Sequence, residues 1–353
     1  MDKKENKKGN KKKYIINIII FFILIFLTFN ILLKDQNMDE LFVILQSVKI
    51  KYVFLGIICM LIYFACEAIN LRRTLRELKE KVKFKDTIKY VLIGFFYSSI
   101  TPAATGGQPM QVYYMYKDGI KTAHSSLALV LNLFSFQTTT ISLALISVIF
   151  FHNYMDSGLY VLFTLGISLN ILALILLIIG IFSKKLSTWL VNVAIKIMRK
   201  LKIKNIEDKE KKLNDVLVKY NGSAKYIRNN KILIVKQFIT TFIQEIIYYS
   251  IPFCTYKAFG LAGTKYIKIV CLQSIVYATV SGIPSPGAVG VSEGAFVSIF
   301  KTIFGENIIN GAMLLNRGVS FYLFVLICGI IVIVNTFKAK RDINKEKEDV
   351  KDD

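Results

Sequence analysis

Two short stretches rich in Gly and Pro interrupt apolar segments of the chain, at residues 101–109 and 281–294. Neither can continue as a regular helix, because Pro lacks a backbone donor and Gly favours turns. At membrane depth, unwound backbone is tolerated only where protein or a watery cavity covers it. A helix that restarts after each break would direct free N–H groups and a positive dipole end at mid-membrane, which favours phosphate. Paired breaks of this kind predict the substrate site of a transporter.

Each break supplies residues that we expect to contact the substrate. Pro109 suits the first turn of a restarting helix, and Ser292 suits a capping position. An alternative is that the Gly and Pro residues only let helices pack closely. The predicted contacts from the two breaks are Thr105, Gly106, Gly107, Gln108, Gly287, Gly290 and Ser292.

Three ionisable residues extend this predicted site. Arg317 and Glu245 lie about 14 and 18 Å inside their apolar segments by helical rise, where a charge is costly and therefore functional by default. Glu293 belongs to the second break. We expect Arg317 to hold a lipid phosphate, and either carboxylate to balance the arginine or meet a cationic headgroup. A purely structural buried pair is the alternative.

Other polar residues in the apolar segments carry less specific predictions. Glu67 lies close to the basic end of its segment, so we expect it to be an interfacial neighbour of Arg72 and Arg73. Five amide side chains could serve either as interhelical hydrogen-bonding groups or as headgroup ligands. They are Asn132, Gln137, Gln244, Gln273 and Asn316.

Residues 290–294 match the GxSxG pattern of serine hydrolases. That pattern works on a strand-to-helix turn, with a histidine base supplied later in the chain. Both histidines, His124 and His152, precede it here, so we do not expect a hydrolase. The five scattered cysteines show no zinc or disulfide spacing, and we expect no metal and no other cofactor.

The composition places the predicted site in a membrane protein. Hydrophobic residues make up 54% of the 353 residues, too many for a soluble domain. The net charge of +22 would suggest nucleic acid in a soluble chain. The basic residues gather in particular connecting segments, however, as topology control produces. We therefore expect an all-α polytopic membrane protein that binds no nucleic acid.

The apolar runs predict about six full spans and two re-entrant helical hairpins. The run before the first break is too short for the roughly 30 Å of a bilayer core, so a hairpin fits it better than a crossing. The second break, within residues 267–304, is interpreted in the same way. The predicted full spans are residues 14–33, 52–69, 123–151, 159–182, 232–256 and 308–337.

The positive-inside rule orients these segments. With both broken segments as hairpins, most of the 46 Lys and Arg residues fall on the inner side. The order span, span, hairpin, span then recurs with opposite orientation, in halves of about 14–151 and 159–337. Such an inverted repeat supports alternating access, and two unrelated halves are the alternative. We expect one membrane domain at 14–340, with cytoplasmic tails at 1–13 and 341–353, in the cell membrane.

The basic connection at residues 184–231 begins with apolar positions at helical spacing. This pattern predicts an amphipathic helix lying on the anionic inner leaflet, in preference to any role with nucleic acid. The apolar positions are Leu186, Leu190, Val193, Ile197 and Leu201, with Trp189 beside Leu190.

The two broken segments, together with Asn316 and Arg317 in the last span, resemble the transmembrane region of the lysylphosphatidylglycerol synthase family, also described as a flippase-like domain. The resemblance extends from Tyr14 to Lys340. In bifunctional members, this region is implicated in moving aminoacylated phosphatidylglycerol to the outer leaflet, while a soluble domain using aminoacyl-tRNA adds the amino acid. The chain ends in a charged tail, so we expect the soluble domain to be absent. At residues 131–132 the family often carries charged residues, which suggests a different headgroup here.

These observations favour a membrane lipid translocase acting on an anionic or aminoacylated phospholipid, such as aminoacylated phosphatidylglycerol. One alternative is phosphatidylglycerol lysyltransferase activity, as the family name implies. The other is a non-transporting membrane scaffold or regulator. No GxxxxGK[ST] motif is present, so we do not expect direct coupling to ATP. A homo-oligomer and a separate synthase partner both remain open.

Overall fold

The computed structural model describes residues 46–335 except 183, 201–205 and 284. Most of these residues are helical, as predicted, and no strand occurs among them. The predicted span at 14–33 and both tails lie outside the described residues. The elements in chain order are α3 (Ile50–Glu77), α4 (Phe84–Ser99), η1 (Pro102–Ala104), α5 (Gly107–Lys117), α6 (Thr122–Phe151), η2 (His152–Tyr154), α7 (Ser157–Phe182), α8 (Lys184–Lys200), α9 (Ile206–Asn229), α10 (Lys231–Tyr249), α11 (Ile251–Ala258), α12 (Tyr266–Val280), η3 (Pro286–Ala288), α13 (Val291–Phe304), α14 (Ile309–Arg317) and η4 (Gly318–Tyr322).

Within the described residues, six helical segments are long and apolar enough to cross a membrane. One of them, Pro286–Phe304, starts at the second break and is the segment that the sequence predicts as a hairpin arm. The others coincide with predicted spans, and they are Ile50–Glu77, Thr122–Tyr154, Ser157–Ile179, Lys231–Ala258 and Ile309–Asn335. The prediction of a polytopic helical membrane protein is therefore confirmed.

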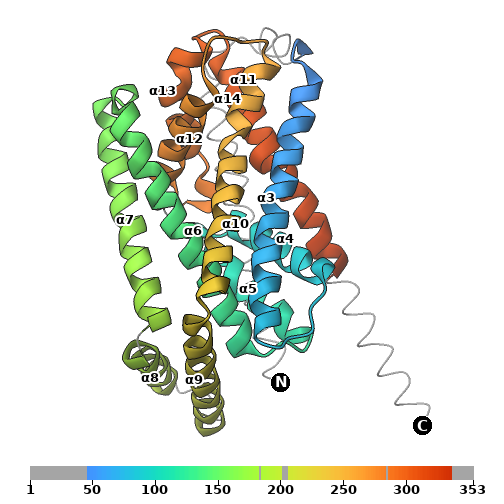
Figure 1. The fold of residues 1–353 in the computed structure, drawn as a ribbon, viewed down its shortest axis with the longest axis vertical. Helices are drawn as coiled ribbons and strands as arrows, with labels where there is room; N and C mark the ends of the chain where they lie inside the picture. The colour runs from blue at the N-terminus through green and yellow to red at the C-terminus, as the bar shows by residue number, and fades with distance from the viewer. Residues whose placement is uncertain (1–45, 183, 201–205, 284, 336–353) are drawn as a thin grey trace, which may run out of the picture.

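The long helices α3, α6, α7 and α10 run along the molecule (Figure 1), and each leaves large apolar side chains exposed. Phe54 of α3, Ile149 of α6 and Leu165 of α7 are among these side chains. Inside the bundle, one apolar cluster gathers around α12 and α13, and another around α3, α4 and α5. Exposed apolar side chains on long helices suit contact with lipid chains.

Each Gly/Pro break joins two short helices that pack against each other, α4 with α5 and α12 with α13. At the open end of the first unit, the Tyr90 hydroxyl of α4 donates to Asp118 after α5 at 2.5 Å. At the open end of the second, the Tyr256 ring lies 5.7 Å from Phe304, which ends α13. The Tyr256 hydroxyl also accepts from the N–H of Thr264, just before α12, at 3.3 Å. In each unit, a residue of or just before the first helix therefore lies close to the end of the second helix.

The two units begin at opposite ends of α6. At the start of α6, His124 Nδ1 lies 2.5 Å from Glu80 Oε1 in the connection that leads into α4. Beyond the other end of α6, Asp156 accepts a hydrogen bond of 2.6 Å from Ser298 of α13. With 30 residues, α6 is about 45 Å long. The first unit therefore has a contact near the start of α6, and the second has one beyond its other end.

The two breaks adopt the same local conformation. Thr101 and Ser285 are extended, with φ/ψ of −119°/143° and −112°/147°. After the proline that follows each of them, Ala103 and Gly287 are left-handed, with φ/ψ of 52°/29° and 60°/15°. The next residue, an alanine in both breaks, is also left-handed. A left-handed alanine costs about 1–2 kcal/mol, so this shape is held by its surroundings.

We predict that the ends of each unit are accessible from one side of the membrane only. In a background without the native cysteines, Lys265→Cys and Glu306→Cys should react with a membrane-impermeant maleimide from the same side. Lys83→Cys and Lys121→Cys, which flank the first unit, should react from the opposite side. All four should react in detergent, which is the control. Labelling the two ends of either unit from opposite sides would show a complete crossing.

Candidate functional site

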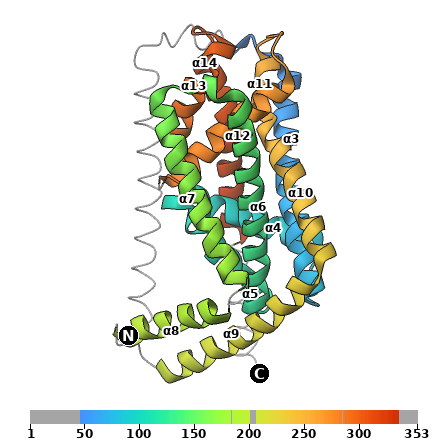
Figure 2. The ribbon, with the colours of Figure 1, turned by 60° about the vertical axis from the view of Figure 1, so that its left-hand side comes forward.

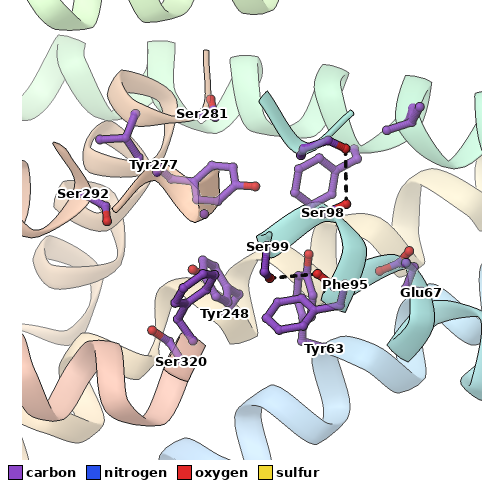
Figure 3. Close-up of a pocket in the computed structure, with 18 of the residues that line it drawn as sticks. Tyr63, Glu67, Phe95, Ser98, Ser99, Tyr248, Tyr277, Ser281, Ser292 and Ser320 are labelled. Atoms are coloured by element: carbon purple, nitrogen blue, oxygen red, sulfur yellow. Dashed lines mark hydrogen bonds between the residues drawn. The ribbon is translucent and has the colours of Figure 1, made fainter. Parts of the chain in front are cut away.

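A cavity of about 580 Å³ lies where the two breaks meet. The turns η1 and η3 contact each other, and Ala103, Ala104, Ser285 and Gly287 from these breaks line the cavity. Further lining residues come from α3, α4, α5, α6, α7, α10, α12, α13 and the last span (Figure 3). The volume falls within the ~300–1,000 Å³ typical of small-molecule sites.

Polar side chains line this cavity at the depth of the apolar segments. All five amide side chains noted in the sequence line it, namely Asn132, Gln137, Gln244, Gln273 and Asn316. Four lining residues have a buried polar atom without a hydrogen-bond partner, and these atoms are Asn132 Nδ2, Gln273 Oε1, Ser285 Oγ and Asn316 Oδ1. An unsatisfied buried polar group costs about 1–3 kcal/mol. Such atoms are suited to a polar ligand or ordered water.

Arg317 and Glu293 form a buried ion pair beside the second break. Arg317 Nε donates to Glu293 Oε1 at 2.7 Å, and Nη2 donates to the Gly287 carbonyl oxygen at 3.1 Å. The guanidinium carbon also lies 4.2 Å from the centre of the Phe321 ring. Arg317 is 8% exposed and Glu293 is 0% exposed. Of the two carboxylates that the sequence offered as partners for Arg317, the structure pairs it with Glu293.

Each oxygen of the Glu293 carboxylate accepts hydrogen bonds from two protein donors. Oε1 accepts from the Tyr322 hydroxyl at 2.8 Å as well as from Arg317. Oε2 accepts from the Gly290 N–H at 2.7 Å and from the Ser292 hydroxyl at 2.9 Å. Gly290, with φ of 89°, occupies the N-cap position of α13, so the prediction of a Ser292 cap is wrong. Glu293 itself meets the positive end of α13, where we expected N–H groups free for phosphate.

A π-helical turn directly after Arg317 shapes this part of the site. It covers Gly318–Tyr322 within the last span. The turn carries Phe321, whose ring underlies the guanidinium, and Tyr322, which donates to Glu293. Single π-helical turns often occur at functional sites. This turn was not predicted from the sequence.

The predicted contacts of the first break divide into two groups. Thr105 and Gln108 line the cavity. The Gly106 N–H donates to Thr101 Oγ1 at 2.9 Å, which closes the turn. A Cβ added at Gly107 would lie 2.9 Å from a carbonyl oxygen of α4, so this glycine permits close packing of α4 on α5. Gly106 and Gly107 thus shape the break, and neither lines the cavity.

Glu245 lies apart from the cavity. It is 0% exposed and accepts hydrogen bonds of 3.0 Å from Thr140 Oγ1 and from the Tyr249 hydroxyl. Within the described residues, the alternative pairing of Glu245 with Arg317 is not found. A helical rise places two charges at similar depth, but it does not fix the direction in which their side chains point.

Glu67 lines the cavity, although its position in the sequence predicted a place at the membrane interface. The helix α3 continues to Glu77, so Glu67 lies about 15 Å from that end. Arg73, one of its expected neighbours, donates instead to Asn70 Oδ1 at 2.8 Å. Glu67 could be identified from the sequence as an ionisable residue in an apolar segment, but the position at which α3 ends could not.

Metal-ligating side chains are not gathered in the part of the chain that the structure describes, where no group of three or more His, Cys, Asp and Glu could hold an ion. His124 is paired with Glu80 away from the cavity. The cavity instead offers amides, hydroxyls, aromatic rings and the charged groups of Arg317 and Glu67. These groups suit recognition of a polar or charged headgroup by hydrogen bonds and charge.

Comparison with known proteins gives a family match over most of the chain. The family described as Lysylphosphatidylglycerol synthase TM region matches residues 14–328. The matched region contains both breaks and the pair of Arg317 and Glu293. The resemblance noted in the sequence is therefore confirmed. The search of curated proteins found no match.

We predict that Gly287→Ala destabilises the protein by about 1–3 kcal/mol, because an L-residue would be strained there. The backbone is left-handed, and the new Cβ would lie 2.2 Å from Phe321 Cζ, beneath the guanidinium of Arg317. Gly294→Ala is the matched control, since nothing lies within 4 Å of a Cβ at that helical position. It should be neutral or stabilise by up to about 1 kcal/mol. Thermal unfolding in detergent measures both, and a Gly287→Ala protein as stable as wild type would contradict this account.

Proposed function

Because the chain belongs to the family of the lysylphosphatidylglycerol synthase TM region, we propose that it moves a phospholipid between the leaflets of the cell membrane. Its family and the six apolar helices among the described residues make it a multi-pass membrane protein, consistent with a lipid-related role. Lipid movement is supported above all by one observation. Two helix breaks that come from opposite ends of α6 contact each other beside a polar cavity of about 580 Å³.

In this proposal, the headgroup enters the cavity while the acyl chains remain in the bilayer. The phosphate would be held near the breaks by the first turn of α5, which carries Gln108, by the Ser285 hydroxyl and by Arg317. The Asn316 and Gln273 amide oxygens would accept hydrogen bonds from headgroup donors. Desolvation of the headgroup is thereby offset by protein contacts.

Alternating access would follow from the two helix–break–helix units. We propose that they are re-entrant hairpins of an inverted repeat, which is consistent with their shared break conformation and opposite points of entry. If the two units exchanged conformations, the opening would move from one face to the other. The break turns η1 and η3, which contact each other, would form the moving boundary between the two openings.

The helices α8 and α9 lie across one end of the bundle (Figure 2). We propose that they rest on the anionic inner leaflet, with Trp189 at the headgroup level, because α8 is basic and Trp189 is exposed. Both chain termini would then be cytoplasmic. This placement would hold the bundle at a fixed depth in the membrane.

We predict that the purified protein accelerates exchange of a fluorescent phospholipid between leaflets of reconstituted vesicles, measured by quenching of the outer leaflet with dithionite. Gln273→Leu should slow this exchange about tenfold, because a hydrogen bond to a charged group is worth about 1.5–3 kcal/mol. The same change should leave thermal stability equal or raise it, since Gln273 Oε1 has no partner in the protein.

Ser274, next to Gln273 in the chain, provides a control in which stability and not lipid exchange should change. Ser274 donates to Ser147 Oγ at 2.8 Å and does not line the cavity. Ser274→Ala should therefore lower stability slightly and leave exchange by the folded protein unchanged. Exchange no faster than in protein-free vesicles would refute lipid movement. New lysylphosphatidylglycerol, seen by mass spectrometry in a host that lacks it, would instead indicate a lysyltransferase.

A further inference from the structure

The charged residues that line the cavity, among those that the structure describes, are Arg317 and Glu67. The charge of Arg317 is compensated by Glu293, at 2.7 Å. Ion pairs within the described residues do not include Glu67, whose side-chain partner is the Gln111 amide. Glu67 is therefore the acidic side chain of the cavity without an ionic partner among the described residues, and a cationic group in the ligand would supply that partner.

Tyrosine side chains accompany Glu67 along the cavity. Tyr63 lies one helical turn before Glu67 on α3, on the same face of the helix. Its ring centre is 5.3 Å from that of Tyr248, which in turn is 5.7 Å from that of Tyr277. All of these residues line the cavity. Aromatic faces attract ammonium groups, and the attraction strengthens where water is excluded.

The cavity is thus chemically different at its two sides. In Figure 3, Ser292 and Ser320, which flank the buried ion pair in sequence, lie across the view from Glu67. Tyr63 and Tyr248 lie between them. A headgroup that carries both a phosphate and an ammonium group matches this arrangement, with its phosphate toward Arg317 and its ammonium toward Glu67.

The sequence predicted that Glu293 or Glu245 would meet a cationic headgroup. Neither carboxylate is available for that contact in the structure. Glu293 accepts four hydrogen bonds from protein donors. Glu245 is enclosed by Thr140 and Tyr249 and does not line the cavity. Glu67 is the carboxylate that a ligand in the cavity can reach.

We propose that Glu67, with Tyr63, Tyr248 and Tyr277, forms an ammonium-binding subsite that makes the cavity select amine-bearing phospholipids over phosphatidylglycerol. This inference rests on the proposed function, because it assigns the headgroup chemistry of the same cavity. Glu67 is here a specificity-determining residue. Its carboxylate accepts hydrogen bonds from a primary ammonium, and the aromatic rings also serve a quaternary one.

The test is a binding experiment that does not depend on transport. The full chain in detergent is mixed with equal amounts of phosphatidylethanolamine and phosphatidylglycerol of the same acyl chains, and native mass spectrometry counts bound lipid. Wild type should bind phosphatidylethanolamine in excess. Glu67→Gln should reduce the ratio of bound lipids about tenfold, the effect of losing one charge-assisted hydrogen bond. Glu306→Gln, which alters an exposed carboxylate paired with Lys301, should keep the wild-type ratio.

A measurement on wild type alone guards against a variant that fails to fold. Choline chloride should displace bound phosphatidylethanolamine, and sodium chloride at the same ionic strength should not. Equal displacement by both salts would identify an inorganic cation site and overturn the subsite. A wild-type preference for phosphatidylglycerol, or an unchanged ratio in folded Glu67→Gln, would also overturn it. Selective binding without exchange in vesicles would leave the subsite standing and refute the transport function instead.

Discussion

The buried pair of Arg317 and Glu293 is the interaction on which the rest of the site depends. It connects the last span to the second break, because Arg317 also holds the Gly287 carbonyl oxygen. Glu293 at the same time receives the Gly290 N–H at the start of α13. Removing one partner of such a pair typically costs about 3–5 kcal/mol, since a buried charge is left alone. The break can therefore remain unwound while the Gly287 carbonyl oxygen and the Gly290 N–H are hydrogen-bonded.

The surroundings of the pair show why a carboxylate is required at this position. The guanidinium and the N-terminal end of α13 both bring positive charge to the same point. One carboxylate compensates both, and the Tyr322 and Ser292 hydroxyls complete its hydrogen bonds. The pair is thus a neutral support for the cavity wall. It leaves the net charge inside the cavity to be decided by Glu67.

The cavity itself carries a stability cost. Buried atoms of Gln273, Asn316 and Ser285 have no hydrogen-bond partner, although buried polar groups in proteins are generally satisfied. Ala103 and Ala288 are left-handed without the freedom of glycine. Such departures cluster at functional sites, where stability is given up for binding or movement. Their concentration beside the two breaks supports a cavity kept for a ligand.

Much of this architecture could be predicted from the sequence, because it depends on local properties. Apolar length identified five spans that the structure contains, and Gly and Pro marked both breaks. The contacts between side chains could not be predicted in the same way. Helical rise made Glu245 a candidate partner of Arg317, and membership of the second break made Glu293 another. Only the packed helices distinguish them.

Glu67 illustrates the same limit. The basic residues after Ile69 suggested the end of a span, yet α3 continues through Arg72 and Arg73 to Glu77. Arg73 remains in the helix because Asn70 and Thr240 accept its hydrogen bonds. Because of this packing, Glu67 lies in the cavity and not at the membrane interface where it was predicted. The π-helical turn after Arg317 likewise depends on the packing of the last span against its neighbours.

The central claim is that a phospholipid headgroup occupies the cavity between the two breaks. The most direct measurement is photo-crosslinking of the reconstituted protein with a phospholipid that carries a diazirine in its headgroup, followed by mass spectrometry of the labelled peptides. Our account predicts labels on cavity residues such as Thr105, Ser285 and Asn316. An excess of the same unlabelled lipid should suppress them. Labels confined to lipid-facing residues such as Phe54 and Ile149 would contradict it.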